Sequence, residues 1–272
     1  MSARDGDRWV VKPGTSVSLA ERDPRDTTGA PGGKKDTKAL LEDLGVELAG
    51  LQERLYAESK QALLVVLQAI DAGGKDGTVK HVFRGVNPQG VSVTSFKQPT
   101  PEELAHDFLW RIHARVPRHG FIGIFNRSHY EDVLIARVHE LVPESVWRRR
   151  YRHINHFEWL LHDSRVTVVK LFLHISREEQ AERLQARLDD PAKRWKFSRG
   201  DLKDRELWPA YINAYEDVLN KTSMEAAPWF IVPANHKWYR DWVITKTLVE
   251  TLDGLGMKYP EPAEPLDDVV IE

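Results

Sequence analysis

A continuous apolar stretch, ALLVVLQAI, occupies residues 62–70 and runs directly into the glycine-rich sequence DAGGKDGT at residues 71–78. The apolar stretch has the length of a strand, and its side chains are apolar at successive positions and not only at alternating ones. A strand of this kind is buried on both faces, as in a parallel sheet that is covered by helices on each side. A helix is predicted from about Thr78 to Arg84. The sequence therefore predicts a strand, a glycine turn and a helix, in that order.

The glycine turn has the chemistry of a phosphate-binding loop. Backbone N–H groups at a strand-to-helix turn, and the N-terminus of the helix itself, favour a bound anion. The match to the P-loop pattern is imperfect, because Ala69 replaces the first glycine and Asp76 stands where Ser or Thr would hold the metal. A tight turn without a ligand is the alternative interpretation. The phosphate-binding candidates are Gly73, Gly74, Asp76, Gly77 and Thr78, together with Lys97 farther along the chain.

Two side chains of the turn are candidates for catalysis. Asp71 follows the buried strand, at the edge where open α/β sheets bind their ligands. A carboxylate beside phosphate groups is repelled unless a metal ion lies between them, so we assign Asp71 to Mg²⁺ or to the acceptor phosphate. A simple turn or N-cap aspartate is the alternative. Lys75 adds a positive charge for a phosphate, and we expect it to face solvent and to contribute little to the core.

The remainder of the chain repeats the alternation of strand and helix. Strands that alternate with helices indicate a parallel sheet with right-handed crossovers. We therefore predict an α/β fold in three layers, with a five-stranded parallel sheet flanked by helices. The four further strands are predicted at 91–96, 121–125, 166–175 and 229–233. Helices are predicted from about Lys38 through Leu55, at 102–115, after residue 125 to about 141, and at 144–163, 178–188, 206–222 and 238–253.

Three regions are expected along the chain. Residues 37–256 form the main domain, and residues 257–272 form a C-terminal tail with three prolines. Residues 1–36 form an N-terminal arm that is rich in Gly, Pro and charged residues, and we expect it to dock through Trp9 and Val10.

A second group of polar residues, FNRSHYED, spans residues 125–132, directly after the strand at 121–125. Many P-loop enzymes end this strand in an acid that orients Mg²⁺, but here Asn126 comes first and the acids follow at Glu131 and Asp132. Arg127 suits bidentate binding of a phosphate. Its alternative is a structural pair with Glu131 or Asp132. We assign no role to His129, which we expect to be an exposed or hydrogen-bonded imidazole.

The third signal is a basic segment, RLQARLDDPAKRWKFSRGDLKDR, at residues 183–205. It holds eight Lys or Arg residues against four Asp residues, and aromatic side chains are interleaved with them. Such a segment between two helices is typical of a lid that closes over phosphates, and we place the lid at about residues 183–206. A solvated charged surface is the alternative. The candidate phosphate contacts in the lid are Arg187, Lys193, Lys196 and Lys203.

The composition excludes several classes of chemistry. The chain has 272 residues, no cysteine and a formal net charge of −2. Thiolate catalysis and Cys-ligated zinc are excluded, and a polyanion has to be bound by a local basic cluster. The polar N-terminus and the lack of a long apolar stretch indicate a cytoplasmic protein without a membrane span.

Four segments, in this order along the chain, resemble the polyphosphate kinase 2 family. They are DAGGKDG (71–77), FNRSHYEDV (125–133), RLQARLDDPAKRWKF with DLKDRELW (183–197 and 201–208), and PANHKWYRDW (233–242). The resemblance covers about residues 38–256. It implies a thymidylate-kinase-like P-loop fold with a helical lid, in which polyphosphate threads a basic channel to meet a nucleotide.

The resemblance also implies Mg²⁺, with Mn²⁺ as a substitute, and a homo-oligomer (dimer or tetramer). By position, Asp71, Gly74, Lys75 and Gly77 correspond to the family's first phosphate loop, Arg127 to the arginine after the third strand, and Arg187 to the lid arginine. The version Asn126-Arg-Ser-His-Tyr-Glu131 resembles the branch that phosphorylates both AMP and ADP. This departure makes Asn126 doubtful as a metal ligand, so Glu131 is the candidate for a charge near the acceptor or its metal.

The sequence thus predicts a reversible transfer of phosphoryl groups from inorganic polyphosphate to adenine or guanine nucleotides. The catalytic candidates are Asp71, Lys75, Asn126, Arg127, Glu131 and Arg187, and the metal candidates are Asp71 and Glu131. An ATP-dependent nucleoside monophosphate kinase shares the fold and the acceptor, but the altered P-loop counts against it. A non-catalytic binder of nucleic acid or another polyanion is disfavoured by the net charge of −2.

Overall fold

The protein is built around a six-stranded sheet, seen in a computed structural model that describes residues 8–266 and 269–271. The strand order is β1-β6-β5-β2-β4-β3. The five strands that the sequence predicts pair in parallel, whereas β1 pairs antiparallel with β6 at one edge. The prediction is one strand short, because β1 has two residues and gives no pattern. The strands are β1 (Val10–Val11), β2 (Ala62–Gln68), β3 (Val91–Ser95), β4 (Ile122–Asn126), β5 (Val166–His174) and β6 (Trp229–Pro233).

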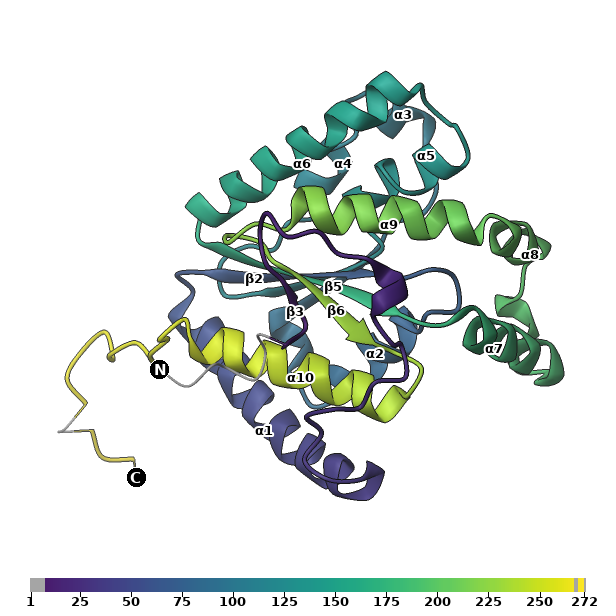
Figure 1. The fold of residues 1–272 in the computed structure, drawn as a ribbon. Coiled ribbons are helices and arrows are strands. Elements are labelled where there is room, and N and C mark those ends of the chain that lie inside the picture. Colours follow the sequence, from purple (N-terminus) through teal and green to yellow (C-terminus); the bar gives the residue numbers. More distant parts are fainter. Residues whose placement is uncertain (1–7, 267–268, 272) are drawn as a thin grey trace.

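Helices cover both faces of the sheet (Figure 1). The alternating side chains of β2 explain this, because Leu64 and Val66 pack in the core beneath α6 and α9, while Leu63, Val65 and Leu67 pack against α1 and α10. The α/β arrangement is as predicted. The helices are α1 (Lys34–Glu58), α2 (Lys75–Val82), α3 (Pro101–Leu104), α4 (Trp110–His113), α5 (Ile135–Val138), α6 (Glu144–Asp163), α7 (Arg177–Asp189), α8 (Arg199–Glu206), α9 (Trp208–Thr222) and α10 (Lys237–Asp253), with 3-10 turns η2 (Leu19–Glu21), η3 (Pro88–Gly90), η4 (His129–Asp132) and η5 (Arg194–Lys196).

One predicted helix is divided in the structure, and another begins later than predicted. The segment 102–115 forms α3 and α4, and between them the Asp107 carboxylate accepts a hydrogen bond from the N–H of Leu109 (3.0 Å). A short polar side chain that binds the backbone in this way competes with a continuous helix. The segment 206–222 begins later than predicted, because α9 starts at Trp208 with a proline in its first turn, and α8 forms a separate helix before it.

The chain after β4 also differs from the expectation of one helix to about residue 141. It forms η4 and then the four-residue helix α5. The hydroxyl of Ser128 accepts a hydrogen bond from the N–H of Tyr130 (3.2 Å), which favours a tight turn at this point. The polar residues that follow β4 therefore lie in a compact turn close to the sheet.

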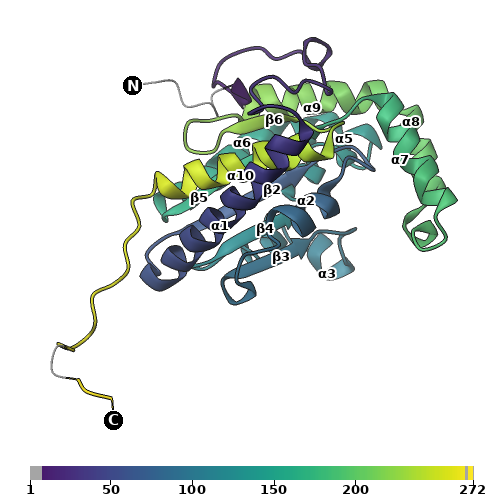
Figure 2. The same ribbon diagram turned by 90° about the horizontal axis from the view of Figure 1, so that it is seen from below.

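The N-terminal arm is docked as the sequence predicts. Trp9 is buried against the rings of Tyr239 and Trp242, and β1 pairs Val10 with Phe230 of β6. At the opposite end of the chain, the residues after α10 lead away from the body of the protein (Figure 2). Within the described ranges, no helix has the length and apolar character that crossing a bilayer requires.

Candidate active site

The glycine turn and the turn after β4 lie side by side. β2 and β4 are parallel neighbours, with Leu67 opposite Asn126, so both strands deliver their following residues to the same edge of the sheet. The backbone is left-handed at Ala72 (φ 61°) and at Arg127 (φ 63°). Non-glycine residues in this region are strained unless their surroundings hold them, and such residues cluster at functional sites.

Two positions of the glycine turn require glycine because neighbouring atoms come too close for a side chain. A Cβ at Gly73 would lie 2.8 Å from the carbonyl oxygen of Ile70, and a Cβ at Gly74 would collide with the guanidinium group of Arg240. Gly74 also has a φ of 105°, which only glycine adopts without strain. The turn therefore brings its backbone to the beginning of α2, where N–H groups can bind an anion.

Lys75 is buried, which corrects the expectation that it faces solvent. It is the first residue of α2, 9% of it is exposed, and its Nζ donates a hydrogen bond to the carbonyl oxygen of Ala69 (2.7 Å). Burial lowers the pKa of Lys75, and the positive charge of Arg127 lowers it further, against the opposing effect of the nearby carboxylates. Close by, the buried hydroxyl oxygen of Thr78 has no hydrogen-bond partner among the described residues.

Arg127 pairs with Asp71. The distance between Arg127 Nη2 and Asp71 Oδ1 is 2.8 Å, and 38% and 25% of the two side chains are exposed. Neither predicted structural partner takes this role, because Asp132 pairs with Arg150 of α6 (3.1 Å). The guanidinium group of Arg127 thus lies between the two turns, half-exposed and free to bind a second anion.

Glu131, in the turn after β4, is half-buried. Its carboxylate accepts a hydrogen bond from the side-chain amide of Gln68 (3.0 Å), whose oxygen in turn accepts one from Ser128 (3.1 Å). Burial raises the pKa of Glu131, although the positive charges of Arg127 and Lys75 oppose that effect. Asp71 and Glu131 are near enough to influence each other, as the pKa of Glu131 is also raised by the charge on Asp71.

Asp76 connects three segments that are distant in the sequence. Its Oδ1 accepts a hydrogen bond from the side chain of Asn126 (2.8 Å), and its Oδ2 accepts one from Nζ of Lys196 in η5 (3.0 Å). The glycine turn, the turn after β4 and the basic segment therefore meet at one exposed carboxylate. The structure thus brings together one predicted residue from each of the three segments: Asp76, Asn126 and Lys196.

The lid segment, defined as residues 183–206, projects from the sheet (Figure 2). Its arginine Arg187 lies 3.5 Å from Asp201 and also donates to the carbonyl oxygen of Lys196 (3.5 Å). Lys193 pairs with Asp190 at the surface (2.6 Å), and Lys203 is exposed on α8.

Lys97 is connected to the site through backbone contacts, and its side chain is exposed. It is exposed just beyond β3, and its carbonyl oxygen accepts a hydrogen bond from Arg111 (2.9 Å). The preceding residue, Phe96, bonds to the carbonyl oxygen of Asn126 (3.2 Å), so Lys97 borders the turn after β4 at the edge of the sheet.

Sequence reasoning missed two arginines that support the glycine turn. Arg183 donates to the carbonyl oxygens of Ala72 (3.2 Å) and Gly73 (3.0 Å). Arg240 donates to the carbonyl oxygen of Gly74 (3.4 Å) and pairs with Asp241 (2.6 Å). Arg183 is the first residue of the basic segment, and Arg240 lies in PANHKWYRDW, so both were within segments that the sequence analysis singled out.

The donor set around Asp71 fits a magnesium ion that is shared with a substrate. Among residues 8–266 and 269–271, no three His, Asp or Glu side chains converge to hold a metal by themselves. Mg²⁺ commonly binds one or two carboxylates and completes its shell with water and substrate phosphates. Asp71 and Glu131, two nearby carboxylates at the mouth of an anion-binding turn, match that requirement.

The fold and this site define an α/β protein whose strand ends gather a glycine turn, basic side chains and acidic groups around a place for phosphates. The model of one family, Polyphosphate kinase 2 (PPK2), matches residues 32–260. The chain belongs to the polyphosphate kinase 2 family.

Individual relatives agree with this assignment. An AMP/ADP-polyphosphate phosphotransferase of Meiothermus ruber is 55% identical over 265 residues, which cover 97% of this chain and 99% of the relative. An ADP-polyphosphate phosphotransferase of Rhodopseudomonas palustris is 46% identical over 240 residues, or 84% of this chain and 83% of the relative. The crystal structure of Polyphosphate Kinase 2 from Arthrobacter aurescens TC1 has a TM-score of 0.91 and 48% identity, with 94% of this chain and 92% of that chain covered.

Proposed function

We propose that this chain transfers phosphoryl groups reversibly from inorganic polyphosphate to AMP and ADP, forming ADP and ATP. The observation that carries the proposal is the meeting of the glycine turn, Arg127 and the lid segment at one edge of the sheet. The names of the relatives from Meiothermus ruber and Rhodopseudomonas palustris support the two acceptors.

The chemistry asks the protein mainly to position phosphates and to neutralise their charge. Lys75 lies at the N-terminus of α2, and Arg127 lies between the two turns. The two side chains therefore approach the negative charge of the transferred phosphoryl group from two sides. Asp71 and Glu131 are the side chains that would hold Mg²⁺ or Mn²⁺, which neutralises phosphate oxygens when bound. No Ser or Cys nucleophile is needed for a direct transfer.

The donor chain has a groove available beside the glycine turn. A cavity of about 1330 Å³ lies between α1, α2 and the start of α10. It reaches the turn through Asn235, whose backbone carbonyl accepts a hydrogen bond from Arg183 (3.3 Å). A polyphosphate chain that leaves the turn along this groove would meet more positive or protonatable side chains than acidic ones. The former are Lys34, Lys38, His81, Arg84, His236 and Lys237, and the latter are Glu42, Glu179 and Asp241.

The lid segment supplies the remaining contacts. Arg187, Lys193 and Lys196 exchange their present partners for phosphate oxygens when the lid closes, and the exposed Lys203 joins them. Two features that the resemblance implies, the homo-oligomer and the use of guanine nucleotides, belong to the same proposal and await their own tests by light scattering and by assays with GMP and GDP.

The deciding experiment incubates the purified protein with Mg²⁺, long-chain polyphosphate and either AMP or ADP, and separates the nucleotides over time. We expect ATP from both acceptors, with ADP as an intermediate when AMP is supplied. A chelator should stop both reactions, and added Mg²⁺ should restore them.

A parallel reaction replaces polyphosphate by ATP, with AMP as the acceptor. Production of ADP from ATP and AMP, together with no product from polyphosphate, would identify an ATP-dependent nucleoside monophosphate kinase instead. Salt-sensitive retention of polyphosphate without any turnover would identify a polyanion binder.

A further inference from the structure

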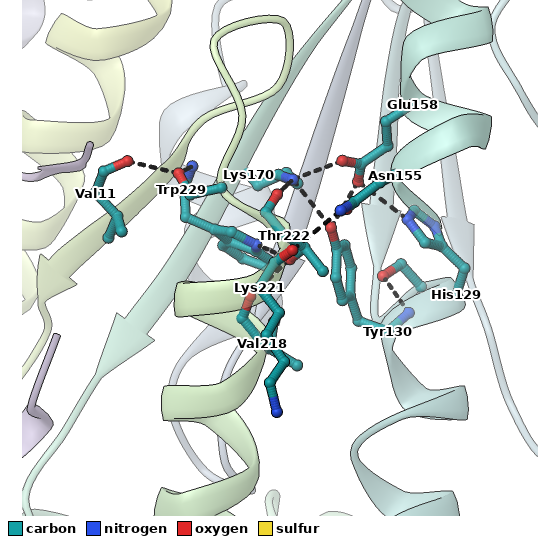
Figure 3. A network of polar contacts seen from close by, with 12 residues as sticks. Val11, His129, Tyr130, Asn155, Glu158, Lys170, Val218, Lys221, Thr222 and Trp229 are labelled. Atoms are coloured by element: carbon teal, nitrogen blue, oxygen red, sulfur yellow. Dashed lines mark hydrogen bonds and ion pairs between the residues drawn. The ribbon is translucent and has the colours of Figure 1, made fainter. Parts of the chain in front are cut away.

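A group of buried charged side chains lies beneath the turn after β4 (Figure 3). Lys170, in the middle of β5, and Glu158, in α6, are both 0% exposed, and Nζ of Lys170 lies 2.6 Å from Oε2 of Glu158. The same Nζ donates to the hydroxyl of Tyr130 (2.9 Å) and to the carbonyl oxygen of Thr222 at the end of α9 (2.6 Å). One lysine thus joins β5, α6, α9 and the turn.

The second oxygen of Glu158 holds the turn itself. Glu158 Oε1 accepts a hydrogen bond from the hydroxyl of Tyr130 (2.7 Å) and lies 3.2 Å from Nε2 of His129. A carboxylate only accepts hydrogen bonds, so Nε2 of His129 carries the hydrogen. Both residues are completely buried, and Figure 3 shows their side chains converging on the Glu158 carboxylate.

These two anchored residues stand between the two charged residues that the transfer uses. Arg127 precedes His129 by two positions, and Glu131 directly follows Tyr130. The backbone of Arg127 is left-handed, a conformation that persists only where the surroundings fix it. The anchoring of His129 and Tyr130 therefore limits how far Arg127 and Glu131 can move relative to the sheet.

A contribution to stability does not by itself explain why the cluster contains the buried ion pair of Lys170 and Glu158. Burial raises the pKa of Glu158, but the charge of Lys170 and the hydrogen bond from His129 outweigh it, so Glu158 has a lowered pKa and is ionised. Replacing a buried ion pair by apolar side chains of similar volume is often neutral or stabilising. A fixed acceptor for two donors of the turn is a function that an apolar core could not provide.

We propose that Glu158 is a positioning residue for phosphoryl transfer, which acts through His129 and Tyr130 on the placement of Arg127 and Glu131, and that Lys170 holds Glu158 in place. The inference rests on the proposed function, because it assigns the turn after β4 to the transfer step. It also predicts that the acceptor oxygen of residue 158, and not the buried charge, is what the reaction needs.

Two double variants separate the oxygen from the charge. Both Glu158→Gln/Lys170→Met and Glu158→Leu/Lys170→Met remove the ion pair and leave the carbonyl of Thr222 without its donor, but only the first keeps an oxygen for His129 and Tyr130. We expect the Gln variant to keep kcat within about threefold of the unmutated enzyme and the Leu variant to lose about tenfold or more, a change of about 1.4 kcal/mol in the activation barrier. The KM for polyphosphate should stay unchanged in both.

A matched control lies at the opposite end of the same cluster. The hydroxyl of Ser223 donates to the carbonyl oxygen of Val11 (2.6 Å) and accepts from the N–H of Trp229 (3.0 Å), which ties β6 to β1 and not to the turn. Ser223→Ala should lower the melting temperature without changing kcat. If the Leu double variant does not fold, Tyr130→Phe tests the same contact, and we expect a severalfold loss of kcat from losing one hydrogen bond.

The outcomes distinguish this inference from the proposed function. No transfer by the unmutated protein would refute the proposed function. Transfer by the unmutated protein, with the same kcat in both double variants, would overturn the positioning role, whether that shared value is normal or reduced. An unchanged kcat in Tyr130→Phe would overturn it as well.

Discussion

The two turns at the strand ends and the lid segment hold their charges in different ways. In the turns, Lys75 is buried, Glu131 is half-buried, and Arg127 is paired with Asp71 at 2.8 Å. In the lid segment, Arg187 lies 3.5 Å from its acidic neighbour, and most basic side chains are exposed. The turns are organised before a substrate arrives, whereas the lid can exchange weak protein contacts for phosphates. Substitutions in the turns should therefore affect stability and turnover together, and those in the lid turnover alone.

The largest effect is expected for Lys75→Ala. Removing a preorganised charge that faces the transferred phosphate should reduce kcat by about 10²–10³-fold. Because Lys75 is buried and bonded to the carbonyl of Ala69, the variant should also lose about 1–3 kcal/mol of unfolding free energy. Chemical denaturation and a nucleotide assay on the same preparation measure both quantities.

Lys75→Met is the control for this prediction, because it keeps the aliphatic stem while it removes the charge. It should be as inactive as the alanine variant but more stable. Near-normal turnover in the methionine variant would show that the charge of Lys75 is not used.

Arg187→Ala tests the lid side of the contrast. The loss of one charge-assisted contact, about 1.5–3 kcal/mol, should lower kcat/KM for polyphosphate roughly tenfold to hundredfold. The melting temperature should not change, since the protein contacts of Arg187 are long. Arg148→Ala, which removes an exposed pair with Glu144, is the control and should be silent. A fall in melting temperature with unaltered kinetics would make Arg187 a structural residue.

Glu131→Asn addresses the choice of acceptor. AMP presents one phosphate fewer than ADP, so the site has to hold the shorter acceptor at the same distance from the donor. If Glu131 holds the charge that makes this possible, the variant should lose about tenfold more kcat/KM with AMP than with ADP, or about 1.4 kcal/mol in difference. Parallel initial rates with both acceptors measure the ratio. Equal losses of kcat/KM with both acceptors would show that Glu131 does not discriminate between AMP and ADP.

The smallest effect is expected for Asp76→Asn, at the point where the two regions touch. The contact between Asp76 and Lys196 is exposed, and such pairs contribute about 0.2–1 kcal/mol. The variant should change the KM for polyphosphate by less than about fivefold in either direction. It should leave the melting temperature unchanged. A large loss of stability would show that the lid is packed against the turn more firmly than these contacts indicate.

The five parallel strands were predicted from the sequence, and the meeting of the two turns follows from them. Parallel strands deliver their carboxyl ends to one edge, so motifs that follow β2 and β4 had to approach each other. The pairing of Arg127 with Asp71 was not predictable, because the two residues are 56 positions apart and the local pattern favoured the nearby Glu131 or Asp132 as partner. The roles of the individual site residues stay predictions until they are measured.

The burial of side chains and contacts between distant parts of the chain also could not be predicted from the sequence. Lys75 looked like an exposed loop residue, and only the structure shows that it is enclosed, with its Nζ bonded to the carbonyl oxygen of Ala69. Arg183 and Arg240 reach the glycine turn from more than a hundred positions away, a separation at which local patterns carry no information. Lys170 stood within an apolar strand, and nothing in that strand indicated the partner it has in α6.

The antiparallel strand β1 has a consequence for how the protein should be handled. β1 covers the outer edge of β6, a strand of five buried residues, and Trp9 fills the adjoining space above α10. Without the arm, β6 would present a row of unpaired backbone groups beside apolar side chains, which is a template for edge-to-edge aggregation. Trp9, Val10 and Val11 thus protect the protein against self-association, and shortening the chain past Val11 removes that protection while the residues of the active site remain in the chain.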